Sequence, residues 1–227
     1  MTSNDINTSN AELSSFIHQA ALDPHLPLES LNEICDASRH FSFSGLVTSL
    51  IRISAARKRL GKSQTTKLIT VIGFPFGDIP HKIKSFQAEW AAEHGAEELE
   101  LVPNFLAIHE NKVEIFAEEI AEICNMGLPT RVILDAARLP QEKLAVAVEA
   151  CIDAGVRGIQ TGSGFGPKVS NPLIAELTAL VKGRCSLKAV GGIKKIDQAL
   201  ELIAAGATEI GTSLGPDLMK ELKNKNR

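Results

Sequence analysis

Several features that mark other classes of protein are scarce or missing in this chain of 227 residues. Its apolar runs are short and interrupted, so none of them has the length of a membrane-spanning helix. The 24 basic and 27 acidic residues give a formal net charge of -3 and are spread along the chain, so they form no basic face for nucleic acid or anionic lipid. We therefore expect neither nucleic acid nor a membrane among its partners.

Cysteine is also sparse, and its spacing argues against two common kinds of site. Cys35, Cys124, Cys151 and Cys185 lie far apart without a CxxC pair, so we interpret them as buried free thiols rather than as disulfides or zinc ligands. The histidines show no HxH or HExxH spacing, which predicts no metal cofactor. Residues 1–15 are polar and lack the basic and apolar regions of a signal peptide, which indicates a cytoplasmic protein.

Short runs rich in valine, isoleucine and leucine alternate with longer amphipathic stretches, a rhythm typical of repeated βα units. The candidate strands cover 15–22, 43–49, 67–75, 97–104, 130–137, 158–164, 187–193 and 208–215. The helix candidates between them end on glycine, as at Gly95 and Gly127. Eight units within about 200 residues predict a single (β/α)8 TIM barrel over residues 1–227, with 1–12 as a flexible segment. A doubly wound open sheet is the alternative.

In such a barrel the active site is assembled at the carboxyl ends of the strands, so polar residues at those ends become candidates. They are His18, Gln19, Glu100, Asn104, Asp135, Gln160 to Gly164, Lys188, Thr212 and Ser213. Four of these, Lys188, Glu100, Gln160 and Asp135, form the predicted catalytic set.

Three glycine-rich turns follow the last three candidate strands: TGSG (161–164), VGG (190–192) and GTSLG (211–215). A single such turn is explained by a tight connection between strand and helix. Three in succession favour an anion site built from backbone N–H groups and hydroxyls, with a phosphate monoester as the ligand. The predicted substrate- and phosphate-binding residues are Thr161, Ser163, Gly164, Gly191, Gly192, Ser213 and His18.

Lys188 lies inside the apolar run CSLKAVGGI, where a charged side chain is costly unless it is paired or used. Burial lowers the pKa of a lysine and prepares it as a nucleophile or general base. A lysine paired with Glu100 or Asp135 instead stays protonated and acts through its charge. An ordinary buried ion pair is the third interpretation.

Several motifs, in order along the chain, resemble the deoxyribose-phosphate aldolase family of class I, Schiff-base aldolases. They are TVIGFPFG (70–77), KSFQAEWAAEHGAEELELVPN (84–104), LKAVGGIK (187–194) and EIGTSLG (209–215), and the match begins near FIHQAALDP (16–24). The resemblance implies a TIM barrel that cleaves 2-deoxyribose 5-phosphate to glyceraldehyde 3-phosphate and acetaldehyde without a metal or other cofactor. It also implies a small phosphorylated sugar or aldehyde as partner, and a possible homodimer.

Only some of the family's catalytic residues are present at the matching positions of this sequence. The family's imine-forming lysine falls on Gln160, its second lysine on Lys188, and its proton-relay aspartate on Glu100. A substrate-facing hydroxyl near the N-terminus is replaced by Ala20, and one in the last turn by Leu214. The phosphate turns are retained at Gly164, Gly191, Gly192 and Ser213. The C-terminal tyrosine that can reach the site in this family has no counterpart, because the chain contains no tyrosine.

Three hypotheses follow. The first is a lyase of reduced or altered activity that forms its imine at Lys188. The second is a different reaction on a phosphorylated carbonyl compound, with Lys188 as electrostatic catalyst, Glu100 or Asp135 as acid or base, and Gln160 binding the carbonyl oxygen. The third is a protein that binds a phosphorylated metabolite without catalysis.

Overall fold

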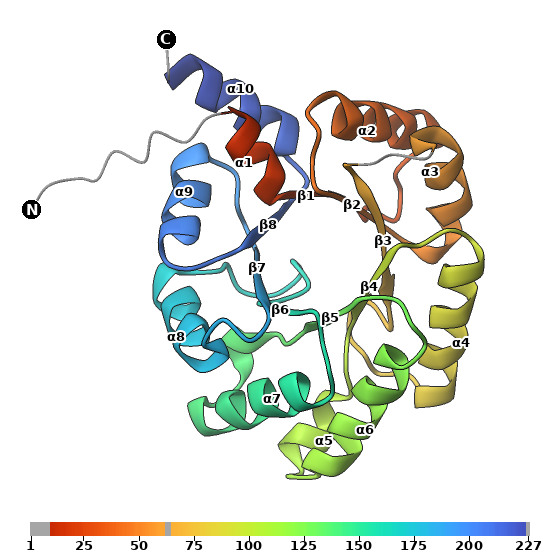
Figure 1. Cartoon of the computed structure of the whole chain (residues 1–227), viewed down its shortest axis with the longest axis vertical. Coiled ribbons are helices and arrows are strands. Elements are labelled where there is room, and N and C mark those ends of the chain that lie inside the picture. Colours follow the sequence, from red (N-terminus) through yellow and green to blue (C-terminus); the bar gives the residue numbers. More distant parts are fainter. Residues whose placement is uncertain (1–9, 62–64, 226–227) are drawn as a thin grey trace, which may run out of the picture.

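The computed structural model describes residues 10–61 and 65–225. Its strands form a closed parallel barrel in chain order, with helices around the outside (Figure 1). The strands are β1 (Ile17–Ala21), β2 (Gly45–Thr48), β3 (Lys67–Ile72), β4 (Glu98–Leu101), β5 (Thr130–Ile133), β6 (Gly158–Gln160), β7 (Ser186–Val190) and β8 (Glu209–Thr212). The predicted barrel is confirmed, and the open sheet is wrong because β1 pairs with β8.

Helices connect the strands and cover the barrel. They are α1 (Asn10–Phe16), α2 (Leu28–His40), α3 (Ile53–Leu60), α4 (His81–Glu93), α5 (Phe105–His109), α6 (Val113–Cys124), α7 (Gln141–Asp153), α8 (Asn171–Val181), α9 (Ile196–Ala204), α10 (Gly215–Lys225) and the 3-10 turns η1 (Leu50–Arg52) and η2 (Ala136–Arg138). Within the described part of the chain, no helix is long and apolar enough to cross a membrane.

The candidate strand runs locate the observed strands closely, although β7 begins at Ser186, one residue before the predicted run. Residues 1–9 of the segment expected to be flexible lie outside the described residues, and Asn10 already begins α1. That helix packs beside α10 at the other end of the chain (Figure 1), where Leu13, Phe43 and Met219 share one apolar cluster. The first and last helices of the described chain therefore cover the same side of the barrel.

The main apolar core lies between the strands and the helices. Alternate residues of the strands point outward and are fully buried there, as Leu46, Leu101 and Ile159 are. Because the helices bury this outer face, the strands read as near-continuous apolar runs in the sequence.

The inside of the barrel has an apolar side and a charged side. Val47, Ile69 and Val71 from β2 and β3 form an apolar cluster. The strands β4, β5, β7 and β8 instead supply a buried charged group: Glu98, Glu100, Arg131, Lys188 and Glu209. Glycines make room for these long side chains, since a Cβ atom at Gly211 would lie 2.7 Å from Cε of Lys188.

Candidate active site

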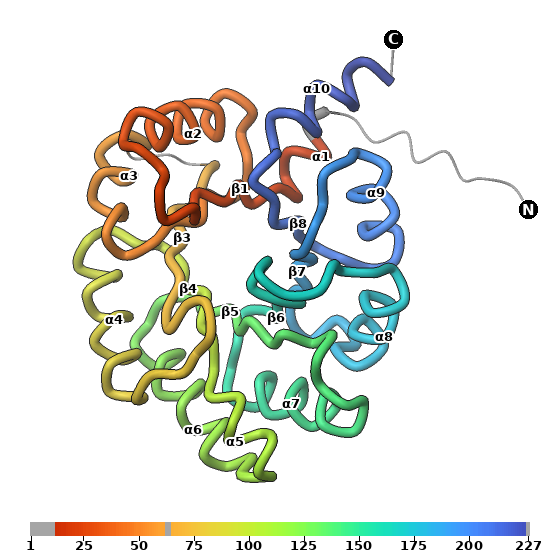
Figure 2. The backbone as a smooth tube through the Cα atoms, turned by 180° about the vertical axis from the view of Figure 1, so that it is seen from behind, coloured from red at the N-terminus to blue at the C-terminus, as the bar shows by residue number. Residues whose placement is uncertain are grey.

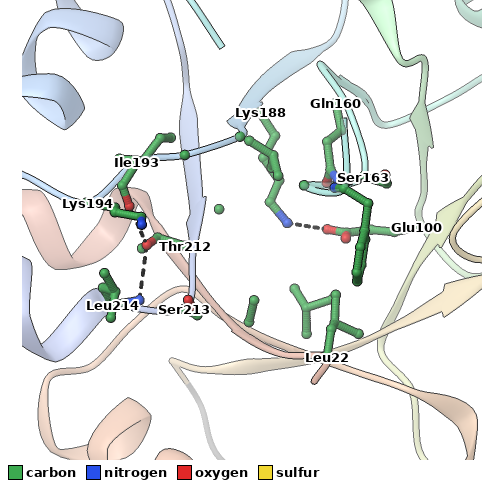
Figure 3. A pocket seen from close by; sticks show the side chains of 18 residues that line it. Leu22, Glu100, Gln160, Ser163, Lys188, Ile193, Lys194, Thr212, Ser213 and Leu214 are labelled. Carbon is green, nitrogen blue, oxygen red and sulfur yellow. Dashed lines mark hydrogen bonds and ion pairs between the residues drawn. The ribbon is translucent and has the colours of Figure 1, made fainter. Parts of the chain in front are cut away.

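A cavity of about 290 Å³ opens at the carboxyl ends of the strands. Figure 2 shows the β6–α8 connection lying across this end of the barrel. Glu100, Gln160 and Lys188 line the cavity, and the turns after β6, β7 and β8 form its polar rim (Figure 3). Its apolar wall consists of Ala20, Leu22, Val47, Phe165, Val190, Ile193 and Leu214.

Lys188 and Glu100 meet inside this cavity although they lie 88 positions apart in the chain. Nζ of Lys188 donates a hydrogen bond of 2.5 Å to Oε1 of Glu100, and both side chains are 2% exposed (Figure 3). Burial lowers the pKa of Lys188, and although Glu100 opposes this, the net direction is downward. Burial acts to raise the pKa of Glu100, but Lys188, His18 and Arg131 outweigh it and hold that pKa at about 2.

Gln160 stands beside Lys188 on the neighbouring strand, because β6 and β7 pair these two residues in register. Its Nε2 donates a hydrogen bond of 2.7 Å to the carbonyl oxygen of Gly162, which fixes the orientation of the amide. Its Oε1 is buried and has no hydrogen-bond partner among the described residues. A buried acceptor of this kind is costly to leave unpaired, so it suits a ligand that brings a donor into the cavity.

A second layer of charge lies around the pair. Nδ1 of His18 is 3.9 Å from Oε1 of Glu100, and NH1 of Arg131 is 3.6 Å from the same oxygen. Arg131 also donates a bond of 2.7 Å to Glu209, which in turn accepts one of 2.9 Å from Arg157. Burial and the nearby Lys188 lower the pKa of His18 to about 4, so this histidine is neutral at pH 7.

The turns predicted to bind phosphate meet at the rim of the cavity. Ser163, Gly164, Gly191, Gly192 and Ser213 all line it. Within the described residues, the backbone N–H groups of Gly192 and Ser213 donate no hydrogen bond to the protein. The backbone at Gly164, Gly191 and Gly192 has positive φ, which favours glycine at each position. The rim can therefore present backbone donors to an anion.

Three residues of the predicted catalytic and binding sets lie elsewhere, and the strand-end candidates Gln19, Asn104 and Gly162 do not line the cavity either. Thr161 does not line the cavity, because its hydroxyl donates to the carbonyl oxygen of Val190 and accepts from the N–H of the same residue, both at 2.9 Å. His18 is buried beside Glu100 rather than exposed to the cavity. Asp135 lies 3.4 Å from Arg138 and lines a separate cavity of about 130 Å³. The structure thus does not bring Asp135 together with Lys188.

Other residues of the site were missed by the sequence analysis. Arg131 and Glu209 are charged residues inside apolar strand runs, the same signal that singled out Lys188, but neither was selected. Lys194 and Phe165 line the cavity from loops, and no pattern in the sequence distinguishes them from solvent-exposed residues. Among the described residues, no group of three or more His, Cys, Asp or Glu side chains is arranged to hold a metal ion.

This arrangement can hold an amine of lowered pKa at the base of a cavity whose rim offers donors to an anion. Such a site can bind a phosphorylated compound with its carbonyl carbon near Lys188. Glu100 opposes the reactivity of the amine, because it stabilises the ammonium form.

Comparison with known proteins gives relatives over nearly the full length, although no family model matches the sequence. A deoxyribose-phosphate aldolase of Microcystis aeruginosa is 34% identical over 221 residues, which are 96% of this chain and 97% of that protein. One of Thermococcus kodakarensis is 33% identical over 215 residues, 92% and 96% of the two chains. Among solved structures, the tetrameric deoxyribose phosphate aldolase of Aeropyrum pernix has a TM-score of 0.86 at 28% identity and covers 96% of this chain and 93% of its own.

Proposed function

Because the chain belongs to the deoxyribose-phosphate aldolase family, we propose that it is a carbon–carbon lyase acting on a phosphorylated sugar, with Lys188 as the amine that forms the imine. The observation that carries this proposal is the position of Lys188. Its side chain is buried in the cavity beneath the glycine-rich turns, and burial lowers its pKa. The names of the relatives supply a deoxyribose phosphate as the substrate, and the resemblance of the motifs to that family implies 2-deoxyribose 5-phosphate.

The proposed reaction begins when Nζ of Lys188 gives up a proton to Glu100 and attacks the aldehyde carbon of the open-chain sugar. Loss of water leaves a protonated imine. Glu100, which returned its proton to the departing water, takes the proton of the C3 hydroxyl as the C2–C3 bond breaks, and the electron pair passes toward the imine nitrogen to form an enamine. Glyceraldehyde 3-phosphate leaves, the enamine carbon takes up a proton, and water releases acetaldehyde and the free amine.

Gln160 and the turns have separate roles in this proposal. The unpaired Oε1 of Gln160 accepts a hydrogen bond from the imine N–H or from a substrate hydroxyl. Backbone N–H groups at Gly192 and Ser213 bind the phosphate. The rate is expected to be low, since Glu100 has a pKa of about 2 and is a weak acceptor for the ammonium proton.

A second candidate function is favoured by one contact. The 2.5 Å hydrogen bond from Lys188 to Glu100 stabilises the ammonium, which then acts by charge on a phosphorylated carbonyl compound without forming an imine. This reaction would use Gln160 to bind the substrate and would leave no covalent adduct.

Borohydride trapping distinguishes the imine-forming lyase from the reaction that forms no covalent adduct. We expect incubation with 2-deoxyribose 5-phosphate and borohydride to leave a reduced adduct on Lys188, located by peptide mass spectrometry. Lys188→Arg should abolish the adduct while keeping the charge, whereas Lys194→Arg, which alters the other lysine lining the cavity, should retain it. If no adduct forms while the sugar phosphate still raises the melting temperature, the imine is excluded and the second candidate or simple binding replaces it.

A further inference from the structure

Arg131 of β5 is a buried cation that lies beside the cavity without lining it. Its side chain is 1% exposed, and β4 and β5 pair it in register with Glu100, so the two side chains are neighbours inside the barrel. NH2 of Arg131 donates hydrogen bonds of 2.7 Å to Glu209 of β8 and 3.1 Å to Ser186 of β7. These contacts hold the guanidinium in a fixed position inside the barrel.

The other two nitrogens of Arg131 are buried without partners. Within the described part of the chain, its Nε and NH1 make no hydrogen bond. Buried N–H groups on a charged side chain are costly to leave unpaired, which points to a second state of the site in which they are used.

A partner for NH1 lies close by, on a carboxylate that Lys188 already binds. NH1 is 3.6 Å from Oε1 of Glu100, just outside hydrogen-bond range, and the same oxygen accepts the 2.5 Å bond from Nζ of Lys188 (Figure 3). A movement of about 0.5 Å would bring NH1 into the usual range. Lys188 and Arg131 are therefore alternative donors to one carboxylate oxygen.

The proposed reaction takes the first of these donors away. As an ammonium, Nζ of Lys188 carries three N–H groups, but as an imine it carries one at most, which the proposed function directs to Gln160. Glu100 then loses its 2.5 Å donor while it stays buried, and a buried carboxylate without a partner is strongly disfavoured. Arginine keeps its charge at any working pH, so Arg131 can replace the lost donor.

We propose that Arg131 is a positioning residue for the imine reaction, and that its NH1 hydrogen-bonds Glu100 while Nζ of Lys188 is bonded to the substrate. Arg131 acts through Glu100 and does not touch the substrate. It keeps the carboxylate in place between the loss of water and the cleavage of the carbon–carbon bond. This role rests on the proposed function, but the charge of Arg131 acts on Lys188 before any substrate binds.

The charges around Lys188 make this effect measurable in the free protein. Burial lowers the pKa of Lys188 most, Glu100 opposes it, Arg131 lowers it further, and Glu209 opposes that. Removing the charge of Arg131 or of Glu209 should therefore change the reactivity of Lys188 in opposite directions, although the two side chains form one hydrogen-bonded pair. The charged and titratable groups that face Lys188 are Glu98, Glu100, Arg131, Glu209 and His18 inside the barrel, with Lys194 at the rim of the cavity.

Trace labelling with acetic anhydride measures this reactivity in the folded full chain, whether or not the chain is a lyase. Peptide mass spectrometry gives the pH of half-maximal labelling for Lys188, with Lys194 as the internal reference. In Arg131→Met this midpoint should move to higher pH by about one unit. Arg131→Lys, which keeps the charge, should restore most of the change, and Glu209→Gln should move the midpoint to lower pH.

Arg157→Met is the matched control for the loss of a cation. Arg157 bonds the same Glu209 at 2.9 Å, but its side chain is 40% exposed, so water and salt screen its charge. The labelling midpoint of Lys188 should move much less in this variant than in Arg131→Met.

The exchange of donors itself is tested by a crystal structure of Lys188→Met, which lacks Nζ. We expect NH1 of Arg131 to lie about 3 Å from Oε1 of Glu100, within hydrogen-bond range. In borohydride trapping with 2-deoxyribose 5-phosphate at pH 7, Arg131→Met should give about tenfold less adduct than the wild type, and Arg131→Lys should recover most of it.

The role of Arg131 is overturned if Arg131→Met leaves the labelling midpoint of Lys188 unchanged, or if Arg131→Met and Glu209→Gln move it in the same direction. It is also overturned if NH1 stays beyond hydrogen-bond range in Lys188→Met. If the midpoints and the distance change as expected but the wild type forms no adduct, the imine of the proposed function is wrong instead, and the donor exchange has no place in the reaction.

Discussion

The contact between Lys188 and Glu100 gives one buried pair both a structural and a chemical role. The carboxylate allows a lysine to be buried inside a barrel, and the same carboxylate raises the pKa of the amine against the effect of burial. Gln160 on the adjacent strand adds no charge, so the pKa of Lys188 is lowered by burial and by Arg131 without a second lysine beside it. The carboxylate that stabilises the buried ammonium of Lys188 therefore also reduces the nucleophilicity of that amine.

We expect Glu100→Gln to destabilise the protein by about 3 to 5 kcal/mol, because it leaves the ammonium of Lys188 buried without a compensating charge. Lys188→Met should also destabilise the protein, because it removes the hydrogen-bond donor of the buried carboxylate, which then has Arg131, 3.6 Å away in the wild type, as its nearest cation. The double variant should be less destabilised than the sum of the two, as urea unfolding at pH 7 will measure. If the effects simply add, the two side chains do not stabilise each other.

We expect Gln160→Lys to raise the rate of 2-deoxyribose 5-phosphate cleavage above that of the wild type. An ammonium at position 160 would lie beside Lys188 and lower the pKa of whichever amine faces the carbonyl. Gln160→Met, which fills the same space without a charge, is the matched control and should give no increase. An unchanged rate in Gln160→Lys, together with retained binding of the sugar phosphate, would show that the site is no longer arranged for aldol cleavage.

The last three strands and the turns that follow them build the rim of the cavity as one unit. Thr161 at the end of β6 hydrogen-bonds both backbone groups of Val190 at the end of β7. Thr212 at the end of β8 donates to the carbonyl oxygen of Ile193 at 3.0 Å and accepts from the N–H of Leu214 at 3.1 Å. The turn after β7 is therefore held by a threonine from each neighbouring strand, and the turn after β8 begins with a hydrogen bond to Thr212 of its own strand.

We expect Thr161→Val, which conserves the shape of the side chain, to lower the free energy of unfolding by about 1 to 3 kcal/mol, since it leaves two backbone groups of Val190 unpaired. It should also weaken the binding of inorganic phosphate, measured by calorimetry, because the β7 turn loses its support. Ser163→Ala in the same loop removes a hydroxyl that only accepts a 3.3 Å bond from Phe165, and its effect on stability should be smaller. Equal losses of unfolding free energy in Thr161→Val and Ser163→Ala would contradict a structural role for Thr161.

For the protein as a whole, the buried charges predict sensitivity to acid. The pKa of His18 is lowered from 6.5 to about 4 by burial and by Lys188, so the unfolded chain binds this proton more readily than the folded one. The contribution of neutral His18 to the free energy of unfolding is complete above about pH 6.5 and is lost as the pH falls toward 4. Glu100 and Glu209, whose pKa values are lowered to about 2, lose theirs from about pH 4.5 downward.

We therefore expect the urea midpoint to fall steadily between pH 7 and pH 4, by an amount equivalent to about 3 kcal/mol for His18. His18→Asn removes this titration, so its midpoint should change less over that interval. A wild-type midpoint that stays level from pH 6.5 to pH 4 would contradict the burial of a neutral histidine.

Much of the architecture was predictable because a parallel barrel buries both faces of its strands. That burial produces apolar runs at regular intervals, and the runs located all eight strands. Lys188 was predictable for the opposite reason, since a charge inside such a run is conspicuous. Arg131 and Glu209 carry the same signal and were missed, and Asp135 was selected although the turn after β5 directs it to Arg138 and another cavity.

Local sequence determines which residues stand at strand ends and which turns need glycine, because strand alternation and backbone sterics act over a few residues. Which of those residues meet depends on the closure of the barrel. Closure places Glu100 of β4 across the interior from Lys188 of β7 and adds His18 of β1 to the same pair, contacts for which strand spacing gives no rule. The tertiary structure also decided the role of Thr161. Its hydroxyl hydrogen-bonds Val190 because β6 and β7 lie side by side in the barrel. Long-range charge pairing, unlike strand periodicity, arises from the three-dimensional packing of distant segments.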